Sequence, residues 1–348
     1  MKLAFTQESD FRRERDFGSK ISATFDFLSS QFKPFFKCLA YFALPGALLM
    51  GIGLALFMGK ATGFYASLFE GARHGGNVPA AGSVDPLAMY RGWGGVGFAL
   101  TMLGGLVTFL LLNSTVYAYL RVRMHLPATE TVQPRQVWAW MRPRLGRVVL
   151  ACLLLLALGL GLLVVLGIAV GGIGLAAGSG SSGVWVVLLV VVGYALIFWL
   201  SVCLALYFPV LWLEDVGPAD ALRRSFYLIR GKWWSTFGLG IIMVMIQSFM
   251  GYLFAIPMYG LMMLDILQLT KTSTSSGSSL PMQAATLLYA GGAVLLLTLP
   301  LLAMSFQYFN LAERRDNIGA RQQLAQLGQL AAPAASNYSY RPDEEGEY

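Results

Sequence analysis

The chain has 348 residues, of which 56% are hydrophobic and 12% are charged, and its mean hydropathy is +0.62. Soluble domains carry about a quarter charged residues, so this composition excludes a soluble globular protein and predicts an all-α integral membrane protein. The formal net charge is +7. We attribute it to the Lys and Arg residues that border membrane spans, and we therefore predict no nucleic-acid partner.

Residues 1–34 are predicted to form a cytoplasmic N-terminal segment that contains one amphipathic helix. The charges of this segment are scattered, which is not typical of a secretory signal. Apolar residues recur at spacings of four, three and four, as one face of a helix requires: Ile21, Phe25, Leu28 and Phe32. We expect Pro34 to separate this helix from the first membrane span.

Six apolar runs are each long enough to cross a bilayer, which takes about 20 residues. The predicted spans cover approximately residues 35–58, 93–120, 148–177, 184–213, 233–264 and 284–311. They define a six-helix membrane domain over residues 35–316. We expect residues 317–348 to form a cytoplasmic, mostly disordered tail, because the end of this segment is polar and acidic.

A second amphipathic stretch precedes the third span and repeats the same helical spacing, with Pro134, Trp138, Met141 and Leu145. A third is predicted between the fourth and fifth spans. Glu214 and Asp215 follow the fourth span, and Pro218 begins the helix, because proline is tolerated at the first helical position. Its apolar face consists of Leu222, Phe226, Ile229 and Trp233, and its opposite face of Arg223, Arg224 and Arg230. We expect Gly231 to end this helix, which would lie in the membrane interface.

The three amphipathic stretches share one register, because Trp138 and Phe226 follow Phe25 by 113 and 201 residues. The same offsets superimpose further apolar positions. One interpretation is three parallel repeats, each an interfacial helix followed by a two-helix hairpin. The alternative is a chance match, since apolar residues are abundant in this chain.

The distribution of Lys and Arg predicts the orientation of the chain. Of the 25 Lys and Arg residues, 21 lie in residues 1–37, 121–147, 223–232 and 314–341. The alternate connections contain only Lys60, Arg73, Arg91 and Lys271. Positive residues remain cytoplasmic, so we predict a multi-pass protein of the bacterial cytoplasmic (inner) membrane with both termini inside.

No residue pattern predicts catalysis. The three cysteines and the two histidines are far apart, at no metal-ligand spacing. We therefore predict that the chain is not an enzyme and has no catalytic residue, no cofactor and no metal site. Gly167 and Gly171 form a G-x-x-x-G pattern, for which close helix packing is the favoured interpretation.

Glu214 and Arg224 are the best candidates for a specific polar role, because they bracket the start of the third amphipathic helix. They either form an ion pair or act as an ordinary interfacial anchor and a snorkelling arginine. Exposed ion pairs contribute about 0–1 kcal/mol, which favours the second interpretation. The candidate structural or interface residues are Phe25, Trp138, Glu214, Arg224, Ser225, Phe226, Trp233 and Trp234.

The third amphipathic stretch also carries a family resemblance, in Pro209, Glu214, Ala221, Arg224, Ser225, Leu228 and Trp233 or Trp234. It resembles a bacterial family of polytopic membrane proteins of unknown function, which includes the membrane domain sometimes fused to glycerophosphodiester phosphodiesterases. Phe309–Arg314 is similar to the closing sequence of this family, and Asp16–Gly18 to the opening of its Bacteroidetes branch. The likeness covers most of residues 16–318. No phosphodiesterase domain lies within these 348 residues, so the resemblance implies an architecture and a membrane location but no activity.

These observations favour a non-enzymatic protein whose basic amphipathic helices organise anionic lipids of the inner leaflet or bind a protein partner, which includes a second copy of the chain. The alternative is a transporter or lipid-translocating protein with a path between the hairpins. The spans contain few ionisable residues, which counts against a proton-coupled carrier. A membrane-embedded enzyme would need paired carboxylates or histidines near one interface, and none is predicted.

Overall fold

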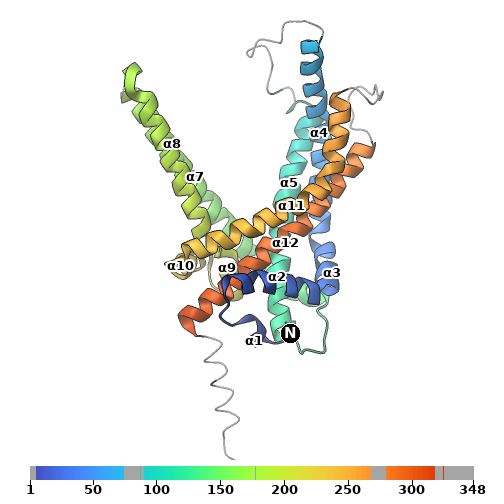
Figure 1. The fold of residues 1–348 in the computed structure, drawn as a ribbon, viewed down its shortest axis with the longest axis vertical. Coiled ribbons are helices and arrows are strands. Elements are labelled where there is room, and N and C mark those ends of the chain that lie inside the picture. Colours follow the sequence, from blue (N-terminus) through green and yellow to red (C-terminus); the bar gives the residue numbers. More distant parts are fainter. Residues whose placement is uncertain are drawn as a thin grey trace, which may run out of the picture.

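The computed structural model describes residues 5–73, 87, 90–176, 178–267, 280–317 and 324 (Figure 1). Every regular element in these residues is a helix, which confirms the predicted all-α fold. In chain order the helices are α1 (Glu8–Phe11), α2 (Phe17–Ser30), α3 (Phe32–Phe42), α4 (Leu44–Arg73), α5 (Trp93–His125), α6 (Pro134–Met141), the 3-10 turn η2 (Arg142–Arg144), α7 (Leu145–Ala176), α8 (Gly178–Cys203), α9 (Tyr207–Leu213), α10 (Pro218–Ile229), α11 (Trp233–Ile266) and α12 (Leu280–Asp316). The predicted tail, apart from Asn317 and Leu324, lies outside the described residues.

Six stretches are long and apolar enough to cross a membrane, as predicted. They are Leu44–Ala61, Trp93–His125, Pro134–Gly172, Gly183–Leu213, Trp233–Leu264 and Leu280–Asp316. The chain is therefore described as a multi-pass membrane protein. The helices differ in the share of their residues that is buried. In the most apolar segment of α12 half of the residues are buried, whereas in that of α7 only 11% are.

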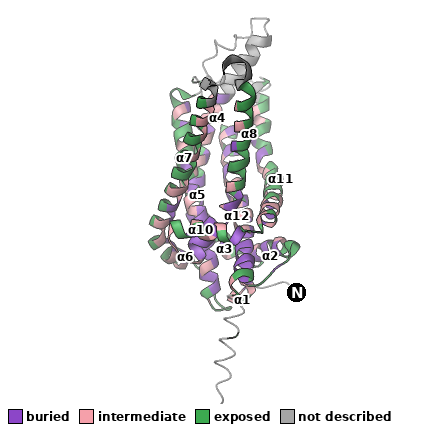
Figure 2. Ribbon diagram, turned by 90° about the vertical axis from the view of Figure 1, so that its left-hand side faces the viewer, coloured by how far each residue is buried: buried purple, intermediate pink, exposed green. Residues whose placement is uncertain are grey.

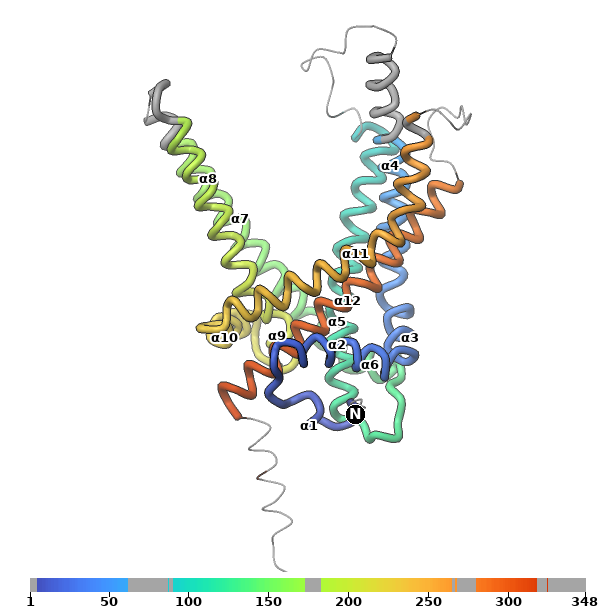
Figure 3. The backbone as a smooth tube through the Cα atoms, in the orientation of Figure 1, coloured from blue at the N-terminus to red at the C-terminus, as the bar shows by residue number. Residues whose placement is uncertain are grey.

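The long helices form two groups. α4, α5, α11 and α12 pack together, whereas α7 and α8 form an antiparallel hairpin that leans away from them (Figures 1 and 3). The short helices α1, α2, α6 and α10 gather at the end where the described N-terminus lies, and we call this the polar end. Buried residues concentrate there, while α7 and α8 are mostly exposed along their length (Figure 2).

The first predicted span, over residues 35–58, differs from the observed helices. It is divided at Ala43 into α3 and α4, and α4 has Pro45 in its first turn. Proline is tolerated in a first turn, because its missing N–H would have no helical partner there. It cannot stand in the interior of one helix that runs on from α3. For the same reason α2 and α3 separate at Gln31, and Pro34 lies in the first turn of α3 instead of before it.

The fourth predicted span, over residues 184–213, is also divided. α8 ends at Cys203, residues 204–206 form a turn, and α9 begins at Tyr207 with Pro209 in its first turn. The break therefore again lies a few residues before a proline. The helix α10 begins at Pro218 as predicted, and Gly231 after it has a φ of +78°, which confirms the expected break.

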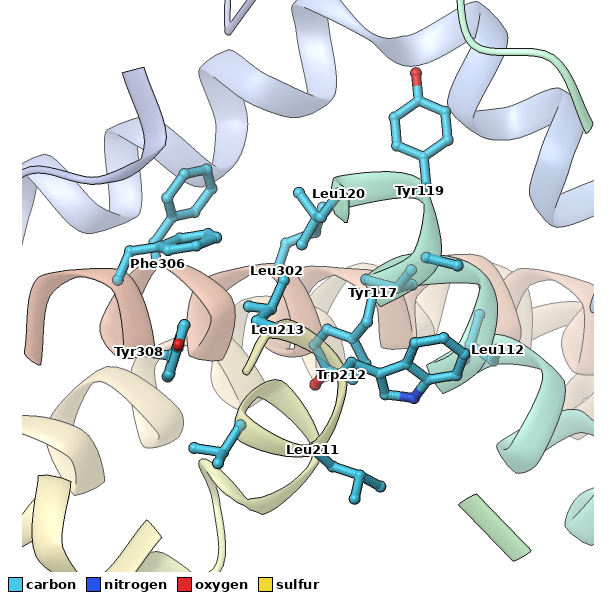
Figure 4. Packing of buried hydrophobic residues seen from close by; sticks show 14 of the residues in the cluster. Leu112, Tyr117, Tyr119, Leu120, Leu211, Trp212, Leu213, Leu302, Phe306 and Tyr308 are labelled. Carbon is cyan, nitrogen blue, oxygen red and sulfur yellow. The ribbon is translucent and has the colours of Figure 1, made fainter. Parts of the chain in front are cut away.

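The largest core cluster lies at the polar end and joins α5, α9 and α12. Figure 4 shows Leu302 and Phe306 of α12 on the side of α5 residue Leu120, and Leu211 and Leu213 of α9 below them. All five side chains are at most 2% exposed. The short helix α9 therefore packs against α5 and α12, although the sequence predicted it to be the end of the fourth span.

The segment before α2 contributes to this core, which the sequence analysis did not predict. Phe5 and Phe11 are fully buried. The ring of Phe5 lies 5.5 Å from that of Phe306, and the ring of Phe11 lies 6.0 Å from that of Phe27, measured between centroids. Aromatic pairs at such distances add about 0.5–1.5 kcal/mol to the burial itself, so this segment is part of the packed polar end.

Glycines allow α4 and α5 to approach closely. A Cβ atom added at Gly53 would lie 2.4 Å from a backbone nitrogen of α5, and one added at Gly104 would lie 2.4 Å from the backbone nitrogen of Met50. Gly97 is restricted in the same way by the backbone of α4. Gly97 and Gly104 are two helical turns apart and share one face of α5, which makes a small-residue contact of the kind found in membrane helix pairs.

The G-x-x-x-G pattern in α7 makes no such contact. Among the described residues, no atom outside the backbone of α7 lies within 4 Å of a Cβ built at Gly167 or Gly171. The prediction of close packing at these glycines is therefore wrong within a single chain, because the α7–α8 hairpin leans away from the other long helices.

Gly104→Ala is predicted to destabilise the protein, whereas the same change at Gly161 is not. A methyl group at position 104 meets the backbone of α4, and overpacking costs about 1–3 kcal/mol. Position 161 has nothing within 4 Å of the added atom, so alanine there gains up to about 1 kcal/mol of helix propensity. The measurement is the temperature at which half of the detergent-purified protein loses its monodisperse elution. Equal midpoints for the two variants would contradict the close contact of α4 and α5.

Candidate functional site at the polar end

The polar end carries two adjacent carboxylates, Glu214 and Asp215, between α9 and α10. α9 ends at Leu213, and α10 begins at Pro218 after the extended residue Gly217. Asp215 has a φ of +61°, in the left-handed region that Asp adopts more readily than most other residues. The two carboxylates bind different parts of the chain.

Glu214 is bound by two other helices. The Nε of Arg224, from α10, donates to both carboxylate oxygens over 3.0 Å, and the hydroxyl of Tyr308, from α12, donates to Oε1 over 3.1 Å. Arg224 also pairs with Asp316 at the end of α12. Burial lowers the pKa of Arg224, but its hydrogen bonds to Asp316 and Glu214 outweigh burial and leave the pKa above its usual value. Arg224 is thus a charged link between α9, α10 and α12, and the snorkelling interpretation is corrected.

Asp215 is bound by the segment that begins α7. The Nε and Nη2 of Arg144 donate to its two oxygens over 3.0 and 2.7 Å, and Nη1 of Arg147 donates to Oδ1 over 2.8 Å. The hydrogen bonds from Arg144 hold the pKa of Asp215 at about 2; partial burial opposes them, and the hydrogen bond from Arg147 supports them. Arg121 of α5 donates to the carbonyl oxygen of the neighbouring Leu213. The loop between α9 and α10 is therefore attached to α5 and α7 as well.

Ser225 lies on the buried face of α10 and binds the end of α8. Its hydroxyl donates to the carbonyl oxygen of Cys203 over 2.7 Å, and its side chain is fully buried. Cys203 is the last residue of α8, and the backbone nitrogen of Tyr207, its helical partner by position, bonds to Leu204 instead. Carbonyl groups at a helix end lack intrahelical donors, so Ser225 supplies the missing one where the chain breaks before α9.

Aromatic side chains of α8, α10 and α11 form a cluster beside this link. The rings of Trp233 and Trp234 meet edge to face with 4.8 Å between centroids, and Nε1 of Trp233 donates to the carbonyl oxygen of Trp199 over 3.3 Å. Phe226 lies 6.1 Å from Trp199, and Trp234 is 76% exposed. The structure therefore places six predicted residues in one region: Glu214, Arg224, Ser225, Phe226, Trp233 and Trp234.

Three cations lie in the same stretch of chain, at exposed positions of α10 and of the turn after it. They are Arg223, Arg230 and Lys232. Within the part of the chain that the structure describes, their side chains form no ion pair and no hydrogen bond, in contrast to Arg224. We call these three residues together with Trp233 and Trp234 the α10 surface.

Phe25 of α2 and Trp138 of α6 lie outside this region and are 37% and 40% exposed. Trp138 stacks on Phe42, with 5.7 Å between centroids and 13° between planes. In α2, α6 and α10 the residue before Phe25, Trp138 or Phe226 is fully buried: these residues are Thr24, Val137 and Ser225. The predicted stripes are therefore covered only in part, since Met141 and Ile229 are at most 1% exposed whereas Phe25 and Trp138 lie at the edge of the contact.

The two residues just before the opening sequence Asp16–Gly18 contact the closing sequence Phe309–Arg314, which was not predicted. The backbone nitrogen of Arg15 donates to Oδ1 of Asn310 over 2.9 Å, and Arg314 pairs with Glu14 at 3.3 Å. An asparagine inside an apolar run is the signal that could have indicated this contact, since a buried amide needs a partner. Other partners that the sequence analysis missed are Tyr308 and Asp316.

Arg224→Gln is predicted to lower the thermal stability of the purified protein, and Arg223→Gln to leave it nearly unchanged. Hydrogen bonds to charged groups contribute about 1.5–3 kcal/mol, and losing Arg224 leaves Glu214 and Asp316 without their shared cation. Changes at exposed, unpaired positions stay within about 0.5 kcal/mol. Adding Glu214→Gln to Arg224→Gln should restore part of the loss, because it removes one of the two negative charges. Identical melting of the two single variants would show that the link does not stabilise the protein.

The comparisons with known proteins cover this region in part. Residues 142–309 match the family model of a domain of unknown function (DUF7847). The match begins in η2 and ends in α12, so it includes Glu214, Arg224 and the α10 surface. Comparisons with curated proteins and with solved structures give no match. Residues 142–309 of this membrane protein are therefore similar to a domain whose function is unknown.

Proposed function

We propose that the chain is a non-enzymatic, multi-pass protein of the bacterial inner membrane that organises anionic lipid, or a protein partner, at the cytoplasmic face. The observation that carries the proposal is the α10 surface, where Arg223, Arg230 and Lys232 are exposed, and unpaired among the described residues, beside two tryptophans. Tryptophan rings favour the level of the lipid headgroups. Each nearby Lys or Arg adds about 1 kcal/mol of attraction to an anionic leaflet.

The helices α2 and α6, also at the polar end, extend this surface in the proposal. Phe25 of α2 and Trp138 of α6 are exposed, and so are the cations Lys33 and Arg135, which follow α2 and begin α6. An apolar flank together with exposed basic residues is what an interfacial helix presents to a membrane.

The ion pairs of Glu214 and Asp215 support a structural role for these two carboxylates over a catalytic one. A carboxyl group that acts as a general acid near neutral pH needs a raised pKa. Arg144 and Arg147 instead hold the pKa of Asp215 at about 2, and Glu214 is engaged by Arg224 and Tyr308.

We further propose that the chain contains three parallel units and is related to the membrane domains sometimes fused to glycerophosphodiester phosphodiesterases. Each of α2, α6 and α10 precedes two long helices in the chain. Burial supports the register, because the offsets of 113 and 201 residues superimpose positions that are all at most 2% exposed. These positions are Thr24, Val137 and Ser225 in one set, and Phe35, Val148 and Thr236 in the other. The relationship to the family rests on the resemblance of residues 209–234.

The proposed orientation is tested with single cysteines in a variant that lacks Cys38, Cys152 and Cys203. Arg135→Cys, at the polar end, is expected to be protected from an impermeant thiol reagent in intact spheroplasts and to be labelled after permeabilisation. Tyr90→Cys, before α5 at the opposite end, is expected to be labelled in both conditions. Labelling of position 135 without permeabilisation would contradict a cytoplasmic polar end.

Replacing the three cations of the α10 surface by glutamine is expected to reduce the enrichment of phosphatidylglycerol around the protein. Each removed charge weakens the attraction by about 1 kcal/mol, or about fivefold. The measurement is the lipid composition of polymer nanodiscs extracted directly from membranes. The matched control is Arg223→Lys with Arg230→Lys and Lys232→Arg, which keeps the charge. Equal enrichment in the glutamine and control variants would contradict lipid organisation by this surface.

A transporter or lipid-translocating protein is the second candidate. Buried polar atoms within the spans favour it, because several of them have no hydrogen-bond partner in the described part of the chain, among them Asn113 Oδ1, Ser114 Oγ and Gln307 Oε1. Such atoms cost free energy unless water or a ligand reaches them. Solute flux or lipid scrambling in liposomes that contain the purified protein, above that of protein-free liposomes, would favour this candidate over the first.

A further inference from the structure

A pocket of about 290 Å³ lies at the polar end, between the segment that joins α1 to α2 and the end of α12. It is lined by Arg13, Glu14, Arg15, Asp16, Ser19 and Arg314. A water molecule takes up about 30 Å³ in the liquid, so the pocket has room for a larger polar group. None of its lining residues belongs to the α10 surface.

The first turn of α2 reaches this pocket with unpaired backbone donors. α2 begins at Phe17, and Asp16 occupies the N-cap position without a side-chain hydrogen bond to the helix. The backbone nitrogen of Lys20 bonds to the carbonyl oxygen of Asp16, whereas the N–H groups of residues 17–19 have no partner among the described residues. Such a helix start favours anions, because its free N–H groups and the helix dipole both attract negative charge.

Arg15 provides independent evidence, because it is a buried cation in the wall of the pocket. It is only 4% exposed, its guanidinium lies 5.1 Å from the ring centroid of Phe306, and it donates to the carbonyl oxygens of Phe11 and Asp10. Its Nε is buried without a hydrogen-bond partner, and no carboxylate among the described residues forms an ion pair with it. Burial and the nearby charge of Arg13 lower the pKa of Arg15 to about 10, and the charge of Asp10 offsets this only in part. An anion in the pocket would supply the missing countercharge.

The charged side chains in and near the pocket carry a net positive charge. Lys20 is 3% exposed, and burial followed by the charges of Arg314 and Lys232 lowers its pKa to about 8. The two lining carboxylates neutralise this only in part. Glu14 pairs with Arg314 at the surface, where its side chain is 58% exposed, and Asp16 is exposed too.

We propose that this pocket binds a phosphate group, either of a phospholipid headgroup or of a small phosphate ester. The phosphate oxygens accept hydrogen bonds from the N–H groups of the first turn of α2 and from the hydroxyl of Ser19. Arg13 and Arg15 supply the opposite charge. The site extends the proposed lipid binding to a second place at the polar end, but it uses different residues from the α10 surface.

The test uses the full chain in phosphatidylcholine nanodiscs, titrated with inorganic phosphate and with glycerol 3-phosphate at constant ionic strength. In a parallel arm the nanodiscs also contain phosphatidylglycerol, and native mass spectrometry counts the lipids retained per chain. Ser19→Asp is the main variant, because a carboxylate in the first turn stabilises α2 but repels phosphate. Arg13→Gln removes an exposed cation of the pocket, and Arg135→Gln is its matched control in α6.

The unaltered chain is expected to bind one phosphate-bearing molecule. Arg13→Gln should weaken this binding about tenfold, Ser19→Asp should weaken it further, and Arg135→Gln should leave it unchanged. Saturable binding of the soluble phosphates alone, or selective retention of one phosphatidylglycerol, supports the site and identifies the source of the phosphate.

The pocket is rejected as a phosphate site if neither arm shows saturable binding, or if Ser19→Asp binds as well as the unaltered chain. A variant with only Arg223→Gln and Arg230→Gln, which keeps Lys232 near Lys20, should retain this binding. Failure of the pocket is thereby distinguished from failure of the proposed lipid organisation at α10.

Discussion

The charged link of Arg224 with Glu214 and Asp316 is the interaction on which the polar end depends. It joins the ends of α9 and α12 through α10, so three separate parts of the chain meet at one guanidinium. Charge pairs gain strength where water is partly excluded, and these side chains are between 19% and 26% exposed. With α10 held in this way, Ser225 faces the free carbonyl group of α8 and Arg223 faces outward.

The two groups of long helices are held to the rest of the protein by different contacts. In a bilayer, apolar side chains gain little from leaving lipid for protein, so helices associate through close packing and polar contacts. α4 and α5 achieve this with glycines, and the end of α12 does so with Tyr308, Asn310 and Asp316. Among the described residues, α7 and α8 lack close glycine contacts and polar contacts with the other long helices along most of their length. They remain exposed, and their attachment is concentrated at the polar end, where Arg144, Arg147 and the carbonyl group of Cys203 are bound.

Burial in the short helices illustrates why their orientation could not be read from apolar spacing. The spacing correctly located α2, α6 and α10, but it did not show which part of each apolar face the bundle covers, and Phe25 and Trp138 are 37% and 40% exposed. Apolar periodicity identifies the side that avoids water, and in a membrane protein that side is shared between protein and lipid. Thr24 and Ser225 are polar and fully buried because each has a backbone carbonyl to bind, which no hydropathy pattern reveals.

The sequence by itself determined the all-helical class, the number of apolar stretches long enough to cross a membrane, and the start of α10 at Pro218 with its break at Gly231. These follow from local chemistry: apolar length, the missing N–H of proline and the conformational freedom of glycine. Only the tertiary structure decided that Phe5 and Phe11 enter the core, that Gly53 and Gly104 are contacts while Gly167 is not, and that Arg224 rather than Arg223 is paired. Each of these depends on which distant residue lies opposite, and adjacent residues of the same type, such as the two arginines, become different only when the packed neighbours are in place.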